Sequence, residues 1–205
     1  MSENRNYSKE LDKIIENLLK SGERPRLLLH ACCAPCSSYC LEYLSRYFDI
    51  TVYYHNPNIS PESEFDYRVS ELRRLIDEMP LSYPVKLVVA AYDASEFENA
   101  VKGLENEPER GSRCTVCYRL RLEKSAEYAS DNGFDYFTTT LSISPYKDAA
   151  RLNGIGEELA GKYSVKFLPS DFKKKNGYKR SVELSGEYGL YRQDYCGCVY
   201  SKRKQ

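Results

Sequence analysis

The chain alternates short apolar runs with longer amphipathic segments, and this alternation constrains its fold more than any other feature. The apolar runs predict strands at 26–30, 50–54, 85–89, 134–138 and 165–168. Apolar residues three or four positions apart predict the helices 7–20, 34–47, one opened by Ser60-Pro61-Glu62, 118–132, and one from Ser144-Pro145 to Gly161. This alternation indicates an α/β fold with a Rossmann-like parallel sheet, right-handed crossovers and helices on both faces.

The length of the chain suits one domain. It has 205 residues, of which 41% are apolar and 29% charged, as expected for an ordinary soluble protein with a full core. We therefore expect a single α/β domain over 1–205, with an N-terminal helical segment at 1–24 and a basic C-terminal extension at 170–205. No apolar run is long enough to span a bilayer and no signal peptide is visible, so we expect a cytoplasmic protein without a membrane partner.

Unusual polar residues follow four of the predicted strands. They are His30-Ala31-Cys32-Cys33, His55-Asn56-Pro57-Asn58, Tyr92-Asp93 and the segment 138–146. Parallel sheets carry their ligands beyond the carboxyl ends of their strands. The sequence therefore predicts one active site at that edge, with the C-terminal extension folded over it.

Eight cysteines lie in three tight groups: Cys32, Cys33, Cys36 and Cys40; Cys114 and Cys117; Cys196 and Cys198. A disulfide framework needs an oxidising compartment, whereas clustered cysteines in an intracellular chain indicate metal binding or redox chemistry. The Cys114-x-x-Cys117 spacing is used by both zinc and iron–sulfur sites. Because one tetrahedral zinc ion cannot use eight thiols, an iron–sulfur cluster with four thiolate ligands fits the count better.

In the first group, the question is whether the side chains of Cys32 and Cys33 point toward the same metal. Neighbouring residues of a strand face opposite sides, but Cys32 and Cys33 lie in a strand-to-helix turn where their side chains can converge. If they do not converge, one serves a cluster and the other a second metal. Cys36 lies in the first helical turn, where the helix dipole favours a thiolate, and we keep it as a ligand candidate. We expect Cys40 to be a small buried residue.

Four segments in order resemble one family. They are His30-Ala31-Cys32-Cys33-Ala34-Pro35-Cys36, Arg113-Cys114-x-x-Cys117-Tyr118-Arg119-Leu120, Thr138 to Lys147, and Tyr195-Cys196-Gly197-Cys198. Together they resemble the cobalamin-independent epoxyqueuosine reductases, over about Arg26 to Tyr200. Four ordered motifs are a much more specific signal than one Cys-x-x-Cys pair.

The resemblance implies an oxidoreductase of tRNA processing, acting at the last step of queuosine synthesis. Its substrate is the anticodon loop of a tRNA that carries epoxyqueuosine at the wobble position, and its cofactor is a [4Fe-4S] cluster, with room for a second, mononuclear iron. By motif position the resemblance implies Cys32, Cys33, Cys114 and Cys117 as cluster ligands. It also implies Cys196 and Cys198 as a redox-active pair or as ligands of a second metal.

Removal of an epoxide oxygen to leave an alkene takes two electrons and two protons, whereas a [4Fe-4S] cluster passes one electron at a time. Cys196 and Cys198 can supply two electrons by closing a strained disulfide. Alternatively, these thiolates and Cys36 hold an iron that takes the epoxide oxygen as a Lewis acid. The sequence leaves both routes open and does not identify the electron donor.

The proton donor also stays open. The candidates are Asp194, Tyr195, Asp148 and His30. His30 is equally well explained as a satisfied core histidine, and Asp93 and Asp148 as caps of turns or helices.

The expectation that the protein binds RNA rests on its charged and aromatic residues. Net charge is zero, so we expect a local patch made by the basic residues at 173–180 and 202–204 with Arg113 and Arg119, although a solvated face is the alternative. One or two of the 19 tyrosines can stack on a base.

Three other functions compete with this interpretation. The first is a zinc- or cluster-stabilised RNA-binding module without catalysis. The second, an ATP-dependent tRNA modification enzyme, lacks the glycines that wrap phosphate after the first strand. The third, a thiol–disulfide oxidoreductase, lacks a Cys-x-x-Cys that begins a helix directly after that strand.

Overall fold

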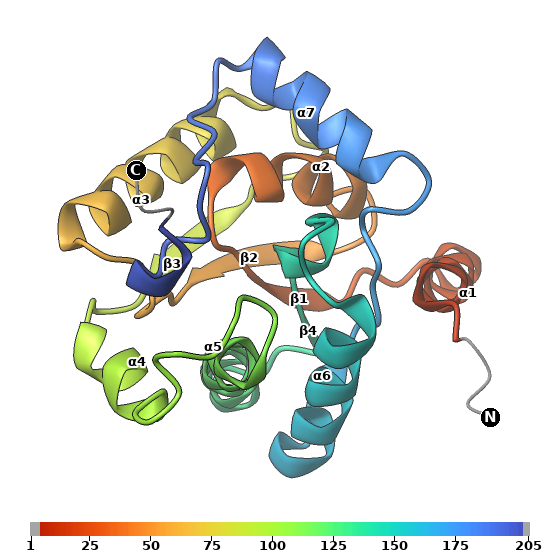
Figure 1. Ribbon diagram of the computed structural model, residues 1–205. Coiled ribbons are helices and arrows are strands. Elements are labelled where there is room, and N and C mark those ends of the chain that lie inside the picture. Colours follow the sequence, from red (N-terminus) through yellow and green to blue (C-terminus); the bar gives the residue numbers. More distant parts are fainter. Residues whose placement is uncertain (1–4, 203–205) are drawn as a thin grey trace.

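The computed structural model describes residues 5–202. At its centre lies a sheet of five parallel strands in the order β3-β2-β1-β4-β5. The strands are β1 Arg26–His30, β2 Asp49–Tyr54, β3 Lys86–Val89, β4 Tyr136–Thr139 and β5 Lys166–Phe167. Figure 1 shows this sheet between two layers of helices, which confirms the predicted α/β fold. Because the chain leaves β1 toward β2 and later returns to its other side at β4, the switch point of the sheet lies beside β1.

Helices cover both faces of the sheet. They are α1 Tyr7–Ser21, α2 Ala34–Leu44, α3 Glu62–Glu78, α4 Ala94–Ala100, α5 Ser112–Asp131, α6 Ala149–Tyr163 and α7 Gly177–Glu187, with the short 3₁₀ turns η1 Thr140–Ile143 and η2 Val199–Ser201. Side chains of α1, α2 and α3 pack in one core, and side chains of α5 and α6 pack in the other.

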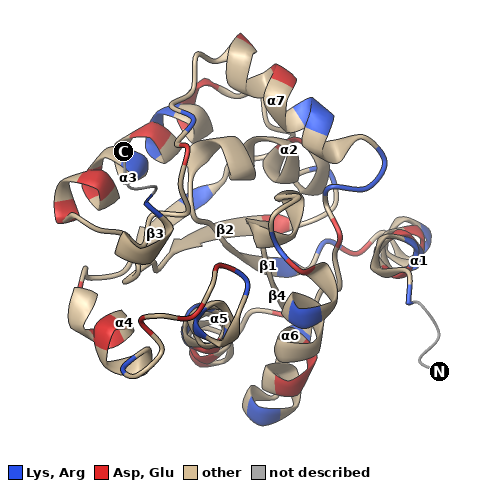
Figure 2. Ribbon diagram, viewed as in Figure 1, with Lys and Arg blue, Asp and Glu red and all other residues tan. Residues whose placement is uncertain are grey.

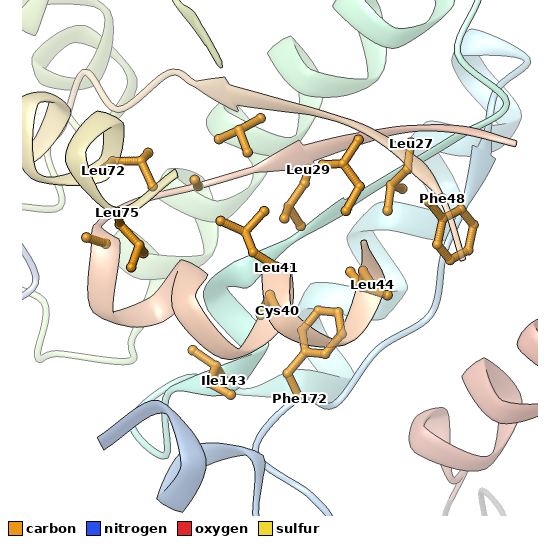
Figure 3. Close-up of a cluster of buried hydrophobic side chains, with 14 of the residues drawn as sticks. Leu27, Leu29, Cys40, Leu41, Leu44, Phe48, Leu72, Leu75, Ile143 and Phe172 are labelled. Carbon is orange, nitrogen blue, oxygen red and sulfur yellow. The ribbon is translucent and has the colours of Figure 1, made fainter. Parts of the chain in front are cut away.

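The central strand shows why the apolar runs were visible in the sequence. Leu27 and Leu29 enter the core beneath α2, where Figure 3 shows them beside Leu41, while Leu28 enters the core beneath α5 and α6. All three leucines of β1 are fully buried. Successive side chains of a strand point to opposite faces of the sheet. When helices cover both faces, every side chain is buried, so the strand appears in the sequence as a continuous apolar run.

Two helix starts differ from the prediction. The helix expected from Tyr118 begins at Ser112, so Cys114 and Cys117 lie in its first two turns and not in a preceding loop. The helix expected at Ser144 begins at Ala149, where the side chain of Asp148 accepts a hydrogen bond from the backbone N–H of Arg151.

The C-terminal extension is more ordered than a tail. Its first part is α7, which the sequence pattern did not predict and which packs against α2 through Gly177. A Cβ on Gly177 would lie 2.0 Å from the backbone oxygen of Phe172, so the contact depends on having no side chain there. The segment after α7 then crosses the carboxyl edge of the sheet, as Figure 1 shows for the blue end of the chain. Arg74 of α3 holds this segment by donating to the carbonyl oxygen of Tyr188.

Candidate metal centre

The turn after β1 brings three thiols together. Ala31 continues the strand by donating to Tyr53, and Asn56 donates to the carbonyl oxygen of Ala31, so the backbone leaves the sheet in a fixed direction. Cys33 is extended and forms the N-cap of α2. As a result, the sulfur atoms of Cys32, Cys33 and Cys36 all lie within 4.8 Å of one another. We call these three residues the turn thiols, and their spacing suits a bound metal.

The contacts among the turn thiols shift their pKa values in opposite directions. Hydrogen bonds from Cys32 and Cys36 hold the pKa of Cys33 well below its usual range, while the same contacts raise the pKa of Cys36. The start of α2 adds to the effect, because a helix N-terminus favours a thiolate. By contrast, Cys40 lies one turn further along α2 in the apolar core, where burial raises its pKa, as expected of a structural cysteine.

A second group of thiols comes from two distant segments. Cys114 and Cys117 of α5 line a small void together with Cys196 and Cys198 of the C-terminal segment. We call these four residues the α5–tail thiols. The void has a volume of about 10 Å³, which is close to the space of one water-sized sphere. The structure therefore places the seven candidate ligand cysteines in two groups, the three turn thiols and the four α5–tail thiols.

A glycine fixes the position of Cys196 and Cys198. Gly197 has a φ of 110°, and a Cβ there would lie 2.9 Å from Ile59 and 3.1 Å from the guanidinium of Arg68. The carbonyl oxygen of Gly197 accepts from the backbone N–H of Ser60 at 3.0 Å, and that of Cys196 accepts from Arg68. These contacts bind the Cys-Gly-Cys segment against the loop after β2 and against α3.

A cavity of about 260 Å³ connects the two groups. Cys32, Cys36 and Cys196 line it, and so does Arg121. This volume lies near the lower end of small-molecule sites, about 300 Å³. The cavity can hold one compact ligand beside the thiols.

Arg121 is a buried cation without a carboxylate partner among residues 5–202. Only 1% of its surface is exposed, and its guanidinium donates to the amide oxygen of Asn56 and the carbonyl oxygen of Cys117. Its Nη2 has no hydrogen-bond partner in the described chain. Burial lowers the pKa of Arg121, but the neighbouring cysteines Cys117, Cys196 and Cys32, as anions, more than offset burial and raise it. An unpaired buried charge is expensive, so the site needs an anion here.

Lys147 is a second cation at the same place. Its Nζ donates to the sulfur of Cys196 at 3.0 Å. Burial lowers the pKa of Lys147, but the negative charges that Cys196 and Tyr118 can carry, together with the hydrogen bond to Cys196, offset burial and raise it. The donor set and the two cations fit a thiolate-bound metal group, whose negative charge would be compensated by Arg121 and Lys147.

The predicted proton donors separate into two sets. Asp194 and Tyr195 line the cavity. Asp148 and Asp93 are N-caps of α6 and α4, as the alternative explanation held. His30 is fully buried with both ring nitrogens in hydrogen bonds, and burial lowers its pKa to about 3, so it is a neutral core residue.

Most of the basic residues predicted to contact phosphate are instead engaged within the protein. Arg113 is buried and donates to three backbone carbonyl oxygens, so it is structural. Arg119 pairs with Glu158, and the cations at 173–180 are mostly paired as well: Lys173, Lys175 and Arg180 meet carboxylates. Figure 2 shows the resulting mixture of red and blue on α7 and α3. Arg203 and Lys204 of the predicted patch lie outside the described residues.

Two buried arginines at the site, one beside the thiols and one that docks the C-terminal segment, carry a signal in the sequence. Arg121 follows Cys114 and Cys117 by seven and four positions, which places all three on one helix face. Arg68 falls within the apolar stripe of α3, between Phe65 and Leu72, where a charged side chain has to find a buried partner.

Fold and site together define a Rossmann-like α/β protein with a group of thiols at the carboxyl edge of its sheet that could hold a metal. The model of the family described as epoxyqueuosine reductase QueH matches residues 27–204. The chain belongs to the epoxyqueuosine reductase family.

Relatives from several bacteria match most of the chain. The epoxyqueuosine reductase QueH of Staphylococcus epidermidis is 45% identical, covering 98% of this chain and 86% of that protein. The Thermotoga maritima protein of the same name is 35% identical, covering 85% of this chain and 89% of its own length. Among solved structures, a predicted subunit of tRNA methyltransferase from Methanocaldococcus jannaschii aligns with a TM-score of 0.47 at 12% identity, covering 78% of this chain and 75% of that chain. None of the helices in residues 5–202 has the length and hydropathy needed to cross a bilayer.

Proposed function

We propose that the protein reduces epoxyqueuosine to queuosine at the wobble position of tRNA, as a cobalamin-independent, cytoplasmic oxidoreductase. The observation that carries the proposal is that two adjoining groups of thiols, seven in all, meet at the carboxyl edge of the sheet. Three of these thiols, Cys32, Cys36 and Cys196, line the larger cavity together with the buried Arg121 and the half-buried Lys147. The names of the relatives supply the substrate, and the cavity supplies a place for it.

We assign a [4Fe-4S] cluster to these thiols. Cys32, Cys33, Cys114 and Cys117 are the ligands by family motif, and the geometry adds Cys36, whose sulfur lies with the first two. Cys196 and Cys198 lie beside the α5 pair and serve as the redox-active pair or as ligands of a second, mononuclear iron. The void between the α5–tail thiols is about as large as one water-sized sphere, and this size favours the role of ligands to a single iron. When bound, the cluster supplies electrons singly.

The reaction breaks both carbon–oxygen bonds of the epoxide, forms one carbon–carbon double bond and releases water, with two electrons and two protons consumed. The protein contributes the proton sources. Lys147 holds a proton at Nζ beside Cys196, and Asp194 and Tyr195 face the same cavity. The electron donor is a separate protein or reductant that the chain does not contain.

The substrate base has to leave its stack to react. A cavity of about 260 Å³ holds one base with its ring substituent and does not hold a folded loop. Enzymes that act on a base in structured nucleic acid turn that nucleotide outward into a pocket. The anticodon loop suits this step because its bases are unpaired.

The rival function is a metal-stabilised RNA-binding module without catalysis. To distinguish the two, the protein is purified without oxygen, and iron, acid-labile sulfide and zinc are measured per chain. We expect about four sulfides with four or five irons for a four-iron cluster with or without a second iron. One zinc with no sulfide, even after reconstitution, would refute the reductase and leave the binding module.

The activity assay uses tRNA carrying epoxyqueuosine with dithionite as electron source and no cobalamin. We expect a nucleoside product that has lost one oxygen atom. Cys33→Ala abolishes both the cluster and the product, whereas Cys40→Ala, a change at a buried thiol on the same helix, leaves both. Full activity of the Cys33→Ala protein would exclude the turn thiols from the reaction.

A further inference from the structure

Two tyrosines lie exposed at the mouth of the cavity. Tyr146 follows η1 and is 64% exposed, and Tyr178 lies in the first turn of α7 and is 37% exposed. Both line the cavity. They come from segments far apart in the sequence, so the fold brings two open aromatic side chains to one rim.

Most other tyrosines near the sheet are already packed. Tyr53 stacks on Tyr128 with ring centroids 4.7 Å apart, and Tyr118 is 2% exposed. The guanidinium of Arg110 lies over one face of Tyr146, 5.7 Å from the ring centroid, which leaves the rest of that ring open. The ring of Tyr178 has no aromatic or cationic partner within the described chain. Exposed aromatic surface beside a cavity is available for a ligand.

The rim also carries cations that no carboxylate neutralises in residues 5–202. Arg110 is exposed and uses its guanidinium on the carbonyl oxygens of Pro145 and Tyr146. Arg192 lines the cavity and donates to the hydroxyl of Ser185. These two differ from the cations of α7, where Arg180 pairs with Glu42.

We propose that Tyr146 and Tyr178 form a stacking rim for the unpaired nucleotides that flank the reacting one, while Arg110 and Arg192 contact their phosphates. Proteins bind single-stranded RNA by stacking bases on aromatic side chains and by placing cations along the backbone. With the reacting base in the cavity, its neighbours leave the loop at the mouth, where both rings lie. This proposal rests on the proposed function, because it takes the tRNA loop as the substrate.

The test measures binding of a fluorescently labelled anticodon stem–loop to the metal-loaded protein at one fixed salt concentration. The variants are Tyr146→Leu and Tyr178→Leu, which keep apolar bulk without a ring, and Tyr146→Phe and Tyr178→Phe, which keep the ring. We expect each leucine variant to raise Kd about five-fold or more, in line with the loss of one base stack, and each phenylalanine variant to bind within about two-fold of the wild type.

Tyr83→Leu is the matched control. Tyr83 is 51% exposed like the rim tyrosines, and a guanidinium, that of Arg24, covers its ring. It precedes β3 and therefore lies at the opposite, amino edge of the sheet. We expect no change in Kd for this variant.

A second measurement reports stacking itself. The base analogue 2-aminopurine is placed on either side of the wobble position, and its fluorescence falls when it stacks. We expect quenching at one or both positions with the wild-type protein, and loss of that quenching with the corresponding leucine variant.

Three results decide the matter. Tight binding by the wild type with unchanged Kd and quenching in the leucine variants would overturn the rim and leave the reductase intact. Weakened binding with the ring dependence described above supports the rim. If the wild type binds no stem–loop, the rim and the tRNA substrate both fail, and the reduction assay on free epoxyqueuosine nucleoside then decides whether a reductase remains.

Discussion

Two arginines are buried to the same extent and have opposite surroundings. Arg68 of α3 and Arg121 of α5 are each 1% exposed. Arg68 donates to the carboxylate of Glu64 at 2.7 Å and to the backbone of the Cys-Gly-Cys segment. Arg121 has only neutral oxygen acceptors within the described chain, and thiols surround it.

The difference separates a structural charge from a charge reserved for a cofactor. The charge of Arg68 has a carboxylate partner, Glu64, in the protein alone, and this pair helps to dock the C-terminal segment. The region around Arg121 is complete only when the thiols are anionic, as they are when they bind a metal. Removing each charge should therefore affect different states of the protein.

The largest effect is expected for Arg121→Met in the metal-loaded protein. Without this cation the anionic metal group loses its nearest counter-charge, and we expect the variant to retain less than half of the wild-type iron after anaerobic reconstitution and desalting. In the metal-free protein, methionine removes an uncompensated buried charge. The free energy of unfolding should therefore either increase or decrease by no more than about 1 kcal/mol. Iron analysis and urea unfolding under reducing conditions measure the two quantities.

Arg68→Met should show the reverse pattern. It leaves the carboxylate of Glu64, whose side chain is 14% exposed, without its partner, and we expect a loss of about 3 kcal/mol of stability with or without metal. Urea unfolding of both states measures this loss. Arg73→Met is the control on the same helix, since Arg73 is exposed and its side chain makes no ion pair or hydrogen bond within residues 5–202, and we expect a change of about 0.5 kcal/mol or less. Equal losses for Arg68→Met and Arg121→Met in the metal-free protein would contradict the contrast between the two regions.

How far the sequence predicts these regions follows from their physics. The strands were visible because both faces of β1 are covered, which requires Leu27, Leu28 and Leu29 in succession. The start of α5 was missed because its first turn holds polar and thiol residues with no apolar period, and Arg113 there is buried through backbone carbonyl oxygens. The α7 helix was missed because its packing depends on the absence of a side chain at Gly177.

The residues of the site also divide into those that the sequence predicts and those that it does not. The turn thiols are close in the sequence, so a local motif could predict that they meet. The α5–tail thiols meet only because the C-terminal segment crosses the sheet edge, and local pattern cannot fix that path. The spacing of Arg121 from Cys114 and Cys117 shows that the three share a helix face, but it does not show that this face is buried, so the sequence did not identify Arg121 as a cation of the site.

The docking of the C-terminal segment can be tested separately from either charge. Gly197→Ala puts a Cβ against Ile59 and Arg68 at a positive φ, and we expect a loss of about 1–3 kcal/mol, seen as a lower Tm in anaerobic thermal unfolding. Gly186→Ala is the matched change, because that glycine lies inside α7 with open space around it. There alanine should stabilise the protein by up to about 1 kcal/mol. A harmless Gly197→Ala would mean that the segment is not held where the structure places it.

The smallest effect concerns the field of Arg121 on a histidine. Burial, with the nearby charges of Arg121 and Lys124, lowers the pKa of His55 to about 4, although the carboxylate of Glu96 lies 3.2 Å from the ring. The unfolded chain binds this proton near pH 6.5, so stability is lost as pH falls from about 6.5 toward 4, by at most about 1.4 kcal/mol per pH unit. Urea unfolding between pH 7 and 5 should show a smaller loss in His55→Gln than in the wild type. Arg121→Met should raise the pKa of His55 and also reduce the loss, whereas Arg68→Met should not change it. Identical pH slopes in all four proteins would mean that Arg121 does not act on His55, and that its charge is already compensated in the metal-free site.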